Sequence, residues 1–178
     1  MEPKKEIFIT KSFDETQKLG ESFIKNPIKS EKALVICLYG DLGSGKTTFT
    51  QGIARGLGIS RRIISPTFNI VRLYKIDLKS QISKLKTKSQ NSKIFYHIDL
   101  YRMENFHEID ALGIKEIINN PNNIVVIEWA QKLGNLLPKE RIDIDFEYLG
   151  EEERRITIKI KSQRAKIKDQ IKTKKNDL

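Results

Sequence analysis

The sequence predicts an α/β sandwich built on a mainly parallel sheet. Segment 33–39 and the centre of segment 122–128, residues 124–127, are continuous apolar runs rich in β-branched residues, which is typical of strands buried on both faces. Helical apolar spacing recurs between the expected strands, as in a chain that alternates strands with helices. Near the end, two strictly alternating segments flank Gly-Glu-Glu-Glu at 150–153 and predict a hairpin that gives the sheet an antiparallel edge.

The other elements can be placed from their local signals. Residues 6–10 alternate as a short strand. Ser12 stands three residues before Glu15, the spacing of a capping box, and predicts a helix that begins there and ends near Ile24. The remaining elements are expected, in chain order, as a helix over 46–57 closed by Gly58, strands within 65–74 and 93–102, and a helix over 105–119.

The length and charge distribution predict one domain with two basic additions. A chain of 178 residues can bury a core of its own. We expect residues 1–160 to form the domain, with a lysine-rich insertion at about 76–93 and a flexible basic tail at 161–178. Segments 75–93 and 161–178 each carry +5, which together equals the whole net charge of +10. Such segments usually stay solvated, and contact with a nucleic-acid backbone is the alternative.

The apolar runs and the single cysteine bear on location. No run reaches the roughly 18 apolar residues of a membrane-spanning helix. The first ten residues have no apolar stretch of the kind found in secretory signals. Cys37 lies inside an apolar run, so we expect a buried structural thiol without an internal disulfide. These features predict a cytoplasmic protein.

Residues 40–47, Gly-Asp-Leu-Gly-Ser-Gly-Lys-Thr, match the phosphate-binding pattern G-x-x-x-x-G-K-S/T. The three glycines permit positive φ angles that bring backbone N–H groups close to phosphate oxygens. Lys46 would reach the β- and γ-phosphates, and the Thr47 hydroxyl would coordinate Mg²⁺. A buried strand precedes the loop and a helix follows it, which is the context that the motif requires. The sequence therefore predicts a P-loop NTPase-like three-layer sandwich that binds a nucleoside triphosphate.

A phosphate loop needs a second acid for Mg²⁺, usually at the end of an apolar strand. Asp99 and Glu128 both fit, and each could ligate the metal directly or through water, or orient an attacking water. The alternative for each is a strand-end carboxylate that caps a helix. Thr67, in Ser-Pro-Thr-Phe, resembles a switch threonine that senses the γ-phosphate and Mg²⁺, the alternative being an ordinary turn residue.

Other polar and aromatic residues carry weaker signals. His97 shares a strand face with Asp99 and has no cysteine or second histidine nearby, so we expect a hydrogen-bonded core residue. Trp129 is expected to pack rather than to stack on a base. No N-K-x-D motif follows the loop, which favours ATP over GTP. Trp129, the loop 10–13 and Arg155 are candidate neighbours of the adenine.

Five segments, in this order, resemble the bacterial TsaE (YjeE-type) ATPases of tRNA threonylcarbamoyladenosine biosynthesis. They are LYGDLGSGKTTFTQGIARGLGI, SPTF, HIDLYR, LGIKE and IEW, within a resemblance that runs from about Thr10 to Ile160. The resemblance implies a small cytoplasmic protein, monomeric by itself, with ATP or ADP and Mg²⁺ as cofactors and weak hydrolysis. It also implies support of the TsaB–TsaD complex, which forms threonylcarbamoyladenosine at position 37 of ANN-decoding tRNAs.

The resemblance also implies roles for single residues. In that family, the matching loop residues hold the phosphates, the residues matching Thr47 and Glu128 are associated with Mg²⁺, and the residue matching Asp99 is important for hydrolysis. The candidate site therefore has nucleotide-binding residues Leu42, Gly43, Ser44, Gly45, Lys46, Thr47 and Thr48, catalytic residues Lys46, Thr67, Asp99 and Glu128, and metal ligands Thr47, Asp99 and Glu128. The insertion and the tail depart from the family pattern, so contacts with tRNA, indirect or through these basic segments, need not carry over.

Two other functions stay open. A small-molecule kinase would need an acceptor pocket and a mobile lid that brings arginines over the phosphates. Candidate arginines are Arg61, Arg62, Arg102, Arg154 and Arg155, although no lid-like domain is evident. A nucleic-acid-binding module that uses the basic segments would show an affinity that falls steeply with salt, and it could coexist with an ATPase.

Overall fold

A seven-stranded sheet forms the centre of the computed structural model, which describes residues 4–25, 33–66, 69–76 and 93–161. The strand order is β1-β7-β6-β2-β5-β4-β3. The four central strands pair in parallel, which confirms the predicted parallel sheet. They are β6 (Arg141–Tyr148), β2 (Leu34–Tyr39), β5 (Asn123–Glu128) and β4 (Lys93–Asp99).

The remaining strands are antiparallel and close the sheet on both sides. The predicted C-terminal hairpin forms between β6 and β7 (Arg154–Lys161). It does not supply the edge strand, because β1 (Lys4–Thr10) pairs with β7 and lies beyond it. At the opposite edge, β3 (Val71–Ile76) pairs with β4. The sheet thus has an antiparallel edge next to the hairpin, as predicted, but its outermost strand is β1. The opposite edge, formed by β3, is also antiparallel and was not predicted.

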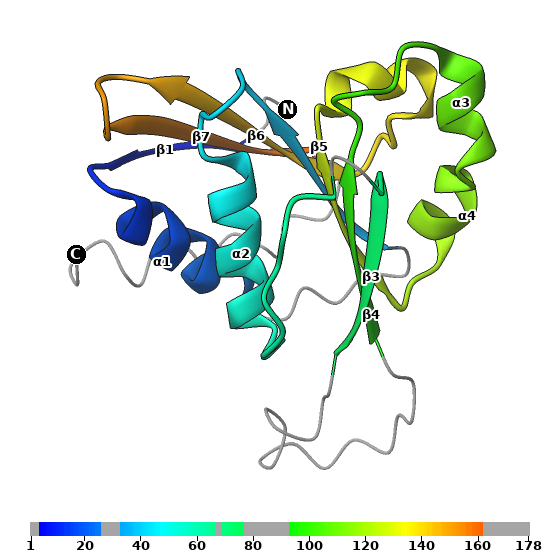
Figure 1. The fold of residues 1–178 in the computed structure, drawn as a ribbon, viewed down its shortest axis with the longest axis horizontal. Helices are drawn as coiled ribbons and strands as arrows, with labels where there is room; N and C mark the ends of the chain where they lie inside the picture. Colours follow the sequence, from blue (N-terminus) through cyan, green and yellow to red (C-terminus); the bar gives the residue numbers. More distant parts are fainter. Residues whose placement is uncertain (1–3, 26–32, 67–68, 77–92, 162–178) are drawn as a thin grey trace.

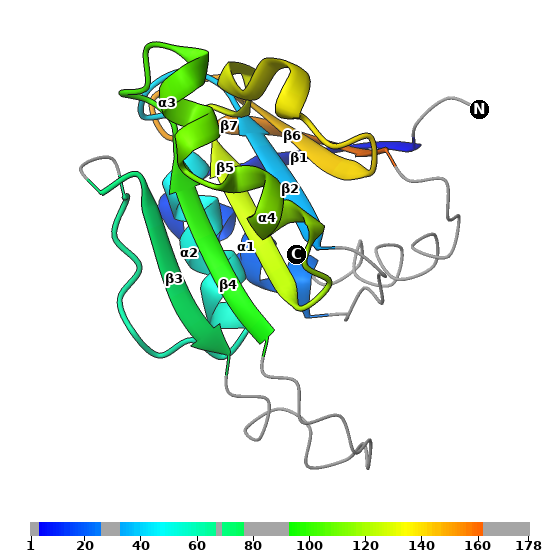
Figure 2. The ribbon, with the colours of Figure 1, turned by 90° about the vertical axis from the view of Figure 1, so that its right-hand side faces the viewer.

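Helices cover both faces of the sheet, so the predicted three-layer sandwich is confirmed (Figure 1). One face carries α1 (Phe13–Ile24) and α2 (Lys46–Gly56), whose apolar side chains pack on one core cluster. The other face carries α3 (Phe106–Ala111), α4 (Ile114–Asn119) and the 3₁₀ helix η1 (Ala130–Leu136), which pack on a second cluster (Figure 2).

Local signals explain where the helices begin and break. The Ser12 hydroxyl accepts the Glu15 N–H at 3.1 Å, and the Glu15 carboxylate accepts the Lys11 N–H at 2.7 Å, which confirms the predicted start of α1. The helix expected over 105–119 is instead divided into α3 and α4. Gly113, with a φ of 67°, stands between them as the N-cap of α4, because this left-handed conformation interrupts a helix.

The two basic additions lie almost wholly outside the described residues. Ile76 and Lys93, the bounds of the predicted insertion, are paired residues of β3 and β4, and 77–92 lie outside the description. Lys161 is the last residue of β7, and the rest of the predicted tail also lies outside. Over the described ranges, no helix is long and apolar enough to cross a membrane.

Candidate nucleotide-binding site

The predicted phosphate loop connects β2 to α2. Gly40, Gly43 and Gly45 have φ angles of 133°, 77° and 103°, so the predicted positive φ values are confirmed. A Cβ atom at Gly40 would lie 2.5 Å from the Phe146 carbonyl oxygen, which leaves no room for a side chain. Gly45 is the N-cap residue of α2 and provides no side-chain cap, so the first N–H groups of this helix face the loop. Backbone and helix together suit an anion.

Lys46 extends back over the loop. Its ammonium group donates to the carbonyl oxygens of Gly40 and Asp41, at 2.8 and 2.6 Å, and lies 4.5 Å from the centre of the Trp129 ring. Burial lowers the pKa of this lysine, and the negative charges of Glu128, Asp99 and Asp41 oppose the shift. The ammonium is thus held in the loop by neutral carbonyl groups, where a phosphate oxygen would be a stronger acceptor. The donor set fits a phosphate.

The two predicted acids lie side by side at the ends of parallel strands. Asp99 of β4 is in register with Glu128 of β5, and Glu128 with Leu38 of β2, just before the loop. Both carboxylates are buried. The Thr47 hydroxyl lies 3.0 Å from each carboxylate oxygen of Glu128, so two of the predicted metal ligands are in direct contact.

Asp99 is held by one residue of the segment that precedes β3 and by one residue just after β4. Its carboxylate accepts a hydrogen bond from the Ser65 hydroxyl and another from the Tyr101 N–H, both at 2.9 Å. Ser65 belongs to the Ser-Pro-Thr-Phe segment, so this segment reaches the site through its serine. Thr67, its predicted switch residue, lies outside the described residues.

His97 contributes a contact that the sequence did not reveal. It is fully buried, and its Nε2 lies 2.8 Å from Glu128 Oε1, which confirms the expected hydrogen-bonded core histidine. Glu128 therefore lies between the Thr47 hydroxyl and the His97 ring, which fixes the orientation of its carboxylate. His97 shares a strand face with Asp99, so its contact with Glu128 could have been inferred only by placing β4 beside β5.

The oxygen donors fit a magnesium ion that binds together with phosphates. In the described part of the chain, no group of three or more His, Cys, Asp and Glu residues could hold a metal alone. Mg²⁺ is usually bound by one or two carboxylates, substrate phosphates and waters. The Thr47 hydroxyl and the Glu128 carboxylate, beside the phosphate loop, match this donor set.

A cavity of about 140 Å³ lies on the other side of the loop. Its lining includes Ser12 and Phe13 of the predicted adenine-contacting loop, together with Gly43, Thr48 and Arg154. Arg155 and Trp129, the other predicted adenine neighbours, are not among the residues that line this cavity. Arg155 pairs with Glu147 at 3.1 Å, and the centre of the Trp129 ring lies 4.5 Å from the Lys46 ammonium group.

The aromatic and thiol groups behave largely as expected. Trp129 is half-buried and packs on the Tyr101 ring, with a centroid distance of 5.1 Å. Its φ of 59° is unusual for a bulky residue and turns the chain from β5 into η1. Cys37 is buried in the second core cluster, as predicted, and burial raises the pKa of its thiol to about 12.

Tyr148 also contacts the phosphate loop, and this contact was not predicted. Its hydroxyl donates to the Leu42 carbonyl at 2.7 Å, and Arg154 lies 4.3 Å from the centre of its ring. Leu42 itself is 67 % exposed, whereas Ser44 is fully buried. The C-terminal hairpin therefore supports the outer side of the phosphate loop.

The family model for "Threonylcarbamoyl adenosine biosynthesis protein TsaE" matches residues 10–156. The chain belongs to the TsaE family. This family acts in tRNA threonylcarbamoyladenosine biosynthesis, as the resemblance implied.

Several individual TsaE proteins are similar over most of the chain. That of Bacillus subtilis is 40 % identical over 123 residues, which cover 69 % of this chain and 67 % of the relative. That of Borreliella burgdorferi is 36 % identical and covers 83 % of this chain and 88 % of the relative. The crystal structure of YdiB from Bacillus subtilis superimposes with a TM-score of 0.64 at 28 % identity, covering 94 % of this chain and 93 % of that one.

Proposed function

We propose that this TsaE-family protein binds ATP with Mg²⁺, hydrolyses it slowly, and thereby supports a TsaB–TsaD type complex in forming threonylcarbamoyladenosine on tRNA. The observation that carries the proposal is the contact between the Thr47 hydroxyl and the Glu128 carboxylate. It joins the phosphate loop to the strand-end acid at the point where a triphosphate and its metal need both.

Each side chain of the site has a proposed task. The loop amides and Lys46 bind the β- and γ-phosphates. Thr47 and Glu128 would hold Mg²⁺, which when bound neutralises charge on the transferred phosphoryl group. We assign the orientation of the attacking water to Asp99, which lies in register with Glu128 and for which the resemblance implies a role in hydrolysis. The Ser65 and Tyr101 hydrogen bonds keep the Asp99 carboxylate in place for this task.

We place the adenine in the cavity beside Ser12 and Phe13. This cavity shares Gly43, Gly45 and Thr48 with the phosphate loop, so one nucleotide can reach both. Phe13 is 61 % exposed and offers an aromatic face for a base.

Hydrolysis would be coupled to the partner through the segment that precedes β3. The hydrogen bond from Ser65 to Asp99 supports this link, because it joins the segment to the side chain that we assign to hydrolysis. ATP would order the segment and γ-phosphate loss would release it, which shifts a binding surface between two states. Slow turnover is enough when one hydrolysis serves one partner cycle.

Two measurements test the proposal. Titration calorimetry of the folded protein with Mg-ATP is expected to show binding, and no heat of association would remove the ATP site. Depletion of the protein in its host is expected to lower threonylcarbamoyladenosine in bulk tRNA. Unchanged modification would remove the pathway role and leave the ATP site intact.

The kinase and nucleic-acid alternatives gain no support. Among the described residues no lid-like domain is present, and two of the candidate arginines are engaged in the hairpin, Arg154 on Tyr148 and Arg155 with Glu147. The basic segments on which a nucleic-acid module would depend lie outside the described residues. Strong stimulation of ADP release by a metabolite would nevertheless favour a kinase.

A further inference from the structure

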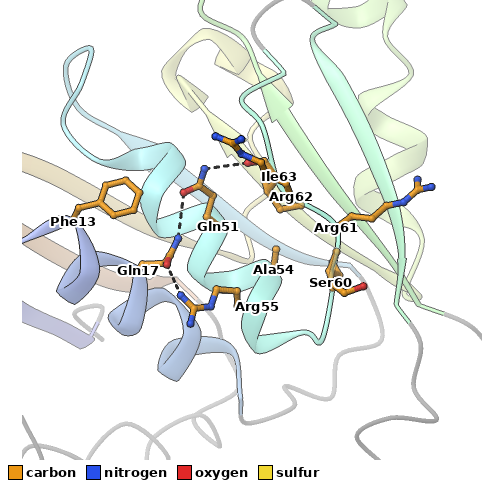
Figure 3. A pocket seen from close by; sticks show the side chains of 10 residues that line it. Phe13, Gln17, Gln51, Ala54, Arg55, Ser60, Arg61, Arg62 and Ile63 are labelled. Carbon is orange, nitrogen blue, oxygen red and sulfur yellow. Dashed lines mark hydrogen bonds between the residues drawn. The ribbon is translucent and has the colours of Figure 1, made fainter.

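A groove of about 320 Å³ lies between α1, α2 and the segment that follows α2 (Figure 3). Gln17 of α1 and Gln51 of α2 hydrogen-bond to each other at 3.3 Å, and Arg55 donates to the Gln17 side chain. Arg61 and Arg62 lie on the segment 59–63 that lines the other side, and the Arg61 guanidinium is directed away from Gln17 and Gln51. We call this feature the arginine groove.

The arginine groove is strongly basic. Arg61 and Arg62 are exposed, and within the described ranges neither forms an ion pair with an acidic side chain. Arg55 has an acidic neighbour, Glu21 at 3.7 Å, but that carboxylate also pairs with Lys25 at 2.7 Å. The groove thus has an excess of positive charge that an acidic occupant would complement.

The lining favours a protein segment over nucleic acid. Half-buried Ile59 contributes apolar surface beside the arginines. A nucleic-acid backbone is bound mainly through charge, spread over many phosphates, whereas a small mixed groove suits a few acidic and apolar side chains. Arginine also binds carboxylates in a bidentate manner.

The groove is connected to the nucleotide site through two hydrogen bonds. Gln51, on the helix that begins in the phosphate loop, donates to the Ile63 carbonyl at 3.0 Å. Two residues later, the Ser65 hydroxyl donates to Asp99. An occupant that binds Arg61 and Arg62 therefore acts on the same segment as the phosphate site, and any coupling between the two must be reciprocal.

We propose that the arginine groove docks an acidic segment of the partner protein, and that bound nucleotide changes the affinity of this docking. The inference rests on the proposed function for its nucleotide dependence. The surface and the chemistry of its occupant are additional to that function.

Charge reversal tests the surface. Arg61→Glu with Arg62→Glu should weaken binding to the purified TsaB–TsaD complex at least about tenfold in the presence of Mg-ATP. ATP affinity, measured on the same protein, should stay unchanged. Arg61→Lys with Arg62→Lys should retain most of the partner affinity. The matched control is Lys5→Glu with Lys139→Glu, which makes the same change in net charge at two exposed sites away from the groove.

The outcomes separate the groove from the proposed function. If the wild-type protein forms no complex in any nucleotide state, both proposals fail. If it binds and the Arg61→Glu/Arg62→Glu variant binds equally well, the groove inference alone fails. Loss of labelled tRNA binding with intact partner binding would show a nucleic-acid surface and overturn the inference.

Crosslinking identifies the occupant directly. Ser60 is exposed at the rim and can be changed to cysteine and coupled to a photoreactive benzophenone. In the wild-type background with the TsaB–TsaD complex, we expect a crosslinked peptide rich in Asp and Glu, with a yield that differs between ATP and ADP. A crosslink only to tRNA, or to a basic or uncharged segment, would contradict the proposal.

Discussion

The Thr47 hydroxyl lies 3.0 Å from both carboxylate oxygens of Glu128, and His97 contacts the same carboxylate from the other side at 2.8 Å. Thr47 of α2 and Glu128 of β5, the two predicted metal ligands, are 81 positions apart in the chain. Their contact places the acid that we predict to bind the metal beside the phosphate loop.

Changing Glu128 to glutamine should separate nucleotide binding from hydrolysis. Glutamine retains the size of the side chain and a hydrogen bond to Thr47, but it lacks the negative charge that Mg²⁺ requires. We expect hydrolysis to fall by about 10²-fold or more, while ATP still binds. Phosphate release and calorimetry measure the two effects, with Glu140→Gln at an exposed position as the control. Hydrolysis at the wild-type rate would contradict the role of Glu128.

Changing Lys46 to alanine should abolish nucleotide binding. The Lys46 ammonium is the only side-chain cation in the phosphate loop. Because the residue is buried, solvent screens its attraction to a phosphate only weakly. The ammonium also lies 4.5 Å from the ring of Trp129, the single tryptophan. Calorimetry should therefore show no ATP binding, and the tryptophan emission should change even without nucleotide. Hydrolysis like that of the wild type would reject the site.

The phosphate loop and the two acids were predictable because their signals are contiguous in the sequence. A loop of fixed spacing defines its own backbone geometry, so the positive φ values at Gly40, Gly43 and Gly45 followed from the motif. Asp99 and Glu128 stand at the ends of apolar strands, and parallel pairing brings such ends together.

Two of the features that were missed depend on which strands become neighbours. The alternation of residues 6–10 predicted a strand, but nothing local indicates that β1 pairs with β7 and forms the edge. The contact of His97 with Glu128 likewise requires β4 beside β5. The break at Gly113 was missed because the apolar spacing continues across it.

Replacing His97 should impair hydrolysis through Glu128. His97→Phe fits an apolar environment of similar shape but removes the hydrogen bond that orients the carboxylate. We expect a loss of about 10- to 100-fold in hydrolysis, with ATP affinity nearly unchanged. His97→Gln should restore part of the activity, because its amide can donate to Glu128, whereas a purely structural role predicts no such rescue. His107→Gln, on the exposed surface of α3, is the control.

Asp143 should contribute stability that is lost at low pH. It receives hydrogen bonds from Arg141 at 2.7 Å and Tyr39 at 3.1 Å, and it pairs with Lys161 at 2.8 Å. Burial alone would raise its pKa, but the bonds from Lys161 and Arg141 outweigh burial and lower the pKa below its ordinary value of 3.8. The stabilisation is therefore complete above that value and decreases as the pH falls through the lowered pKa.

Asp143→Asn measures this contribution. At neutral pH the variant should unfold with a free energy about 1–3 kcal/mol lower than that of the wild type, since one charged partner is lost. The difference should stay constant down to about pH 5 and shrink below about pH 4. Urea titrations at several pH values provide the curve. A difference that grows as the pH falls would contradict the lowered pKa.

Gly52→Ala should destabilise the protein although alanine favours helices. Gly52 of α2 faces α1, where a Cβ atom would lie 2.0 Å from the Gln17 carbonyl oxygen, and Gly20 of α1 faces Phe49 of α2 in the same way, at 2.3 Å from its carbonyl oxygen. Because the contacts are with backbone, the helices must move apart. We expect a loss of about 3 kcal/mol, which exceeds the gain of about 1 kcal/mol in helix propensity.

The displaced helix should also affect the site. α2 begins at Lys46, so a shift of its axis moves the ammonium group and the loop amides, and ATP affinity should fall in the remaining folded protein. Thermal unfolding and calorimetry measure the two effects. Gly150→Ala is the matched control, because a Cβ atom there would have its nearest neighbour at 3.8 Å. Equal stability of the two alanine variants would show that the close approach of α1 and α2 does not require a glycine.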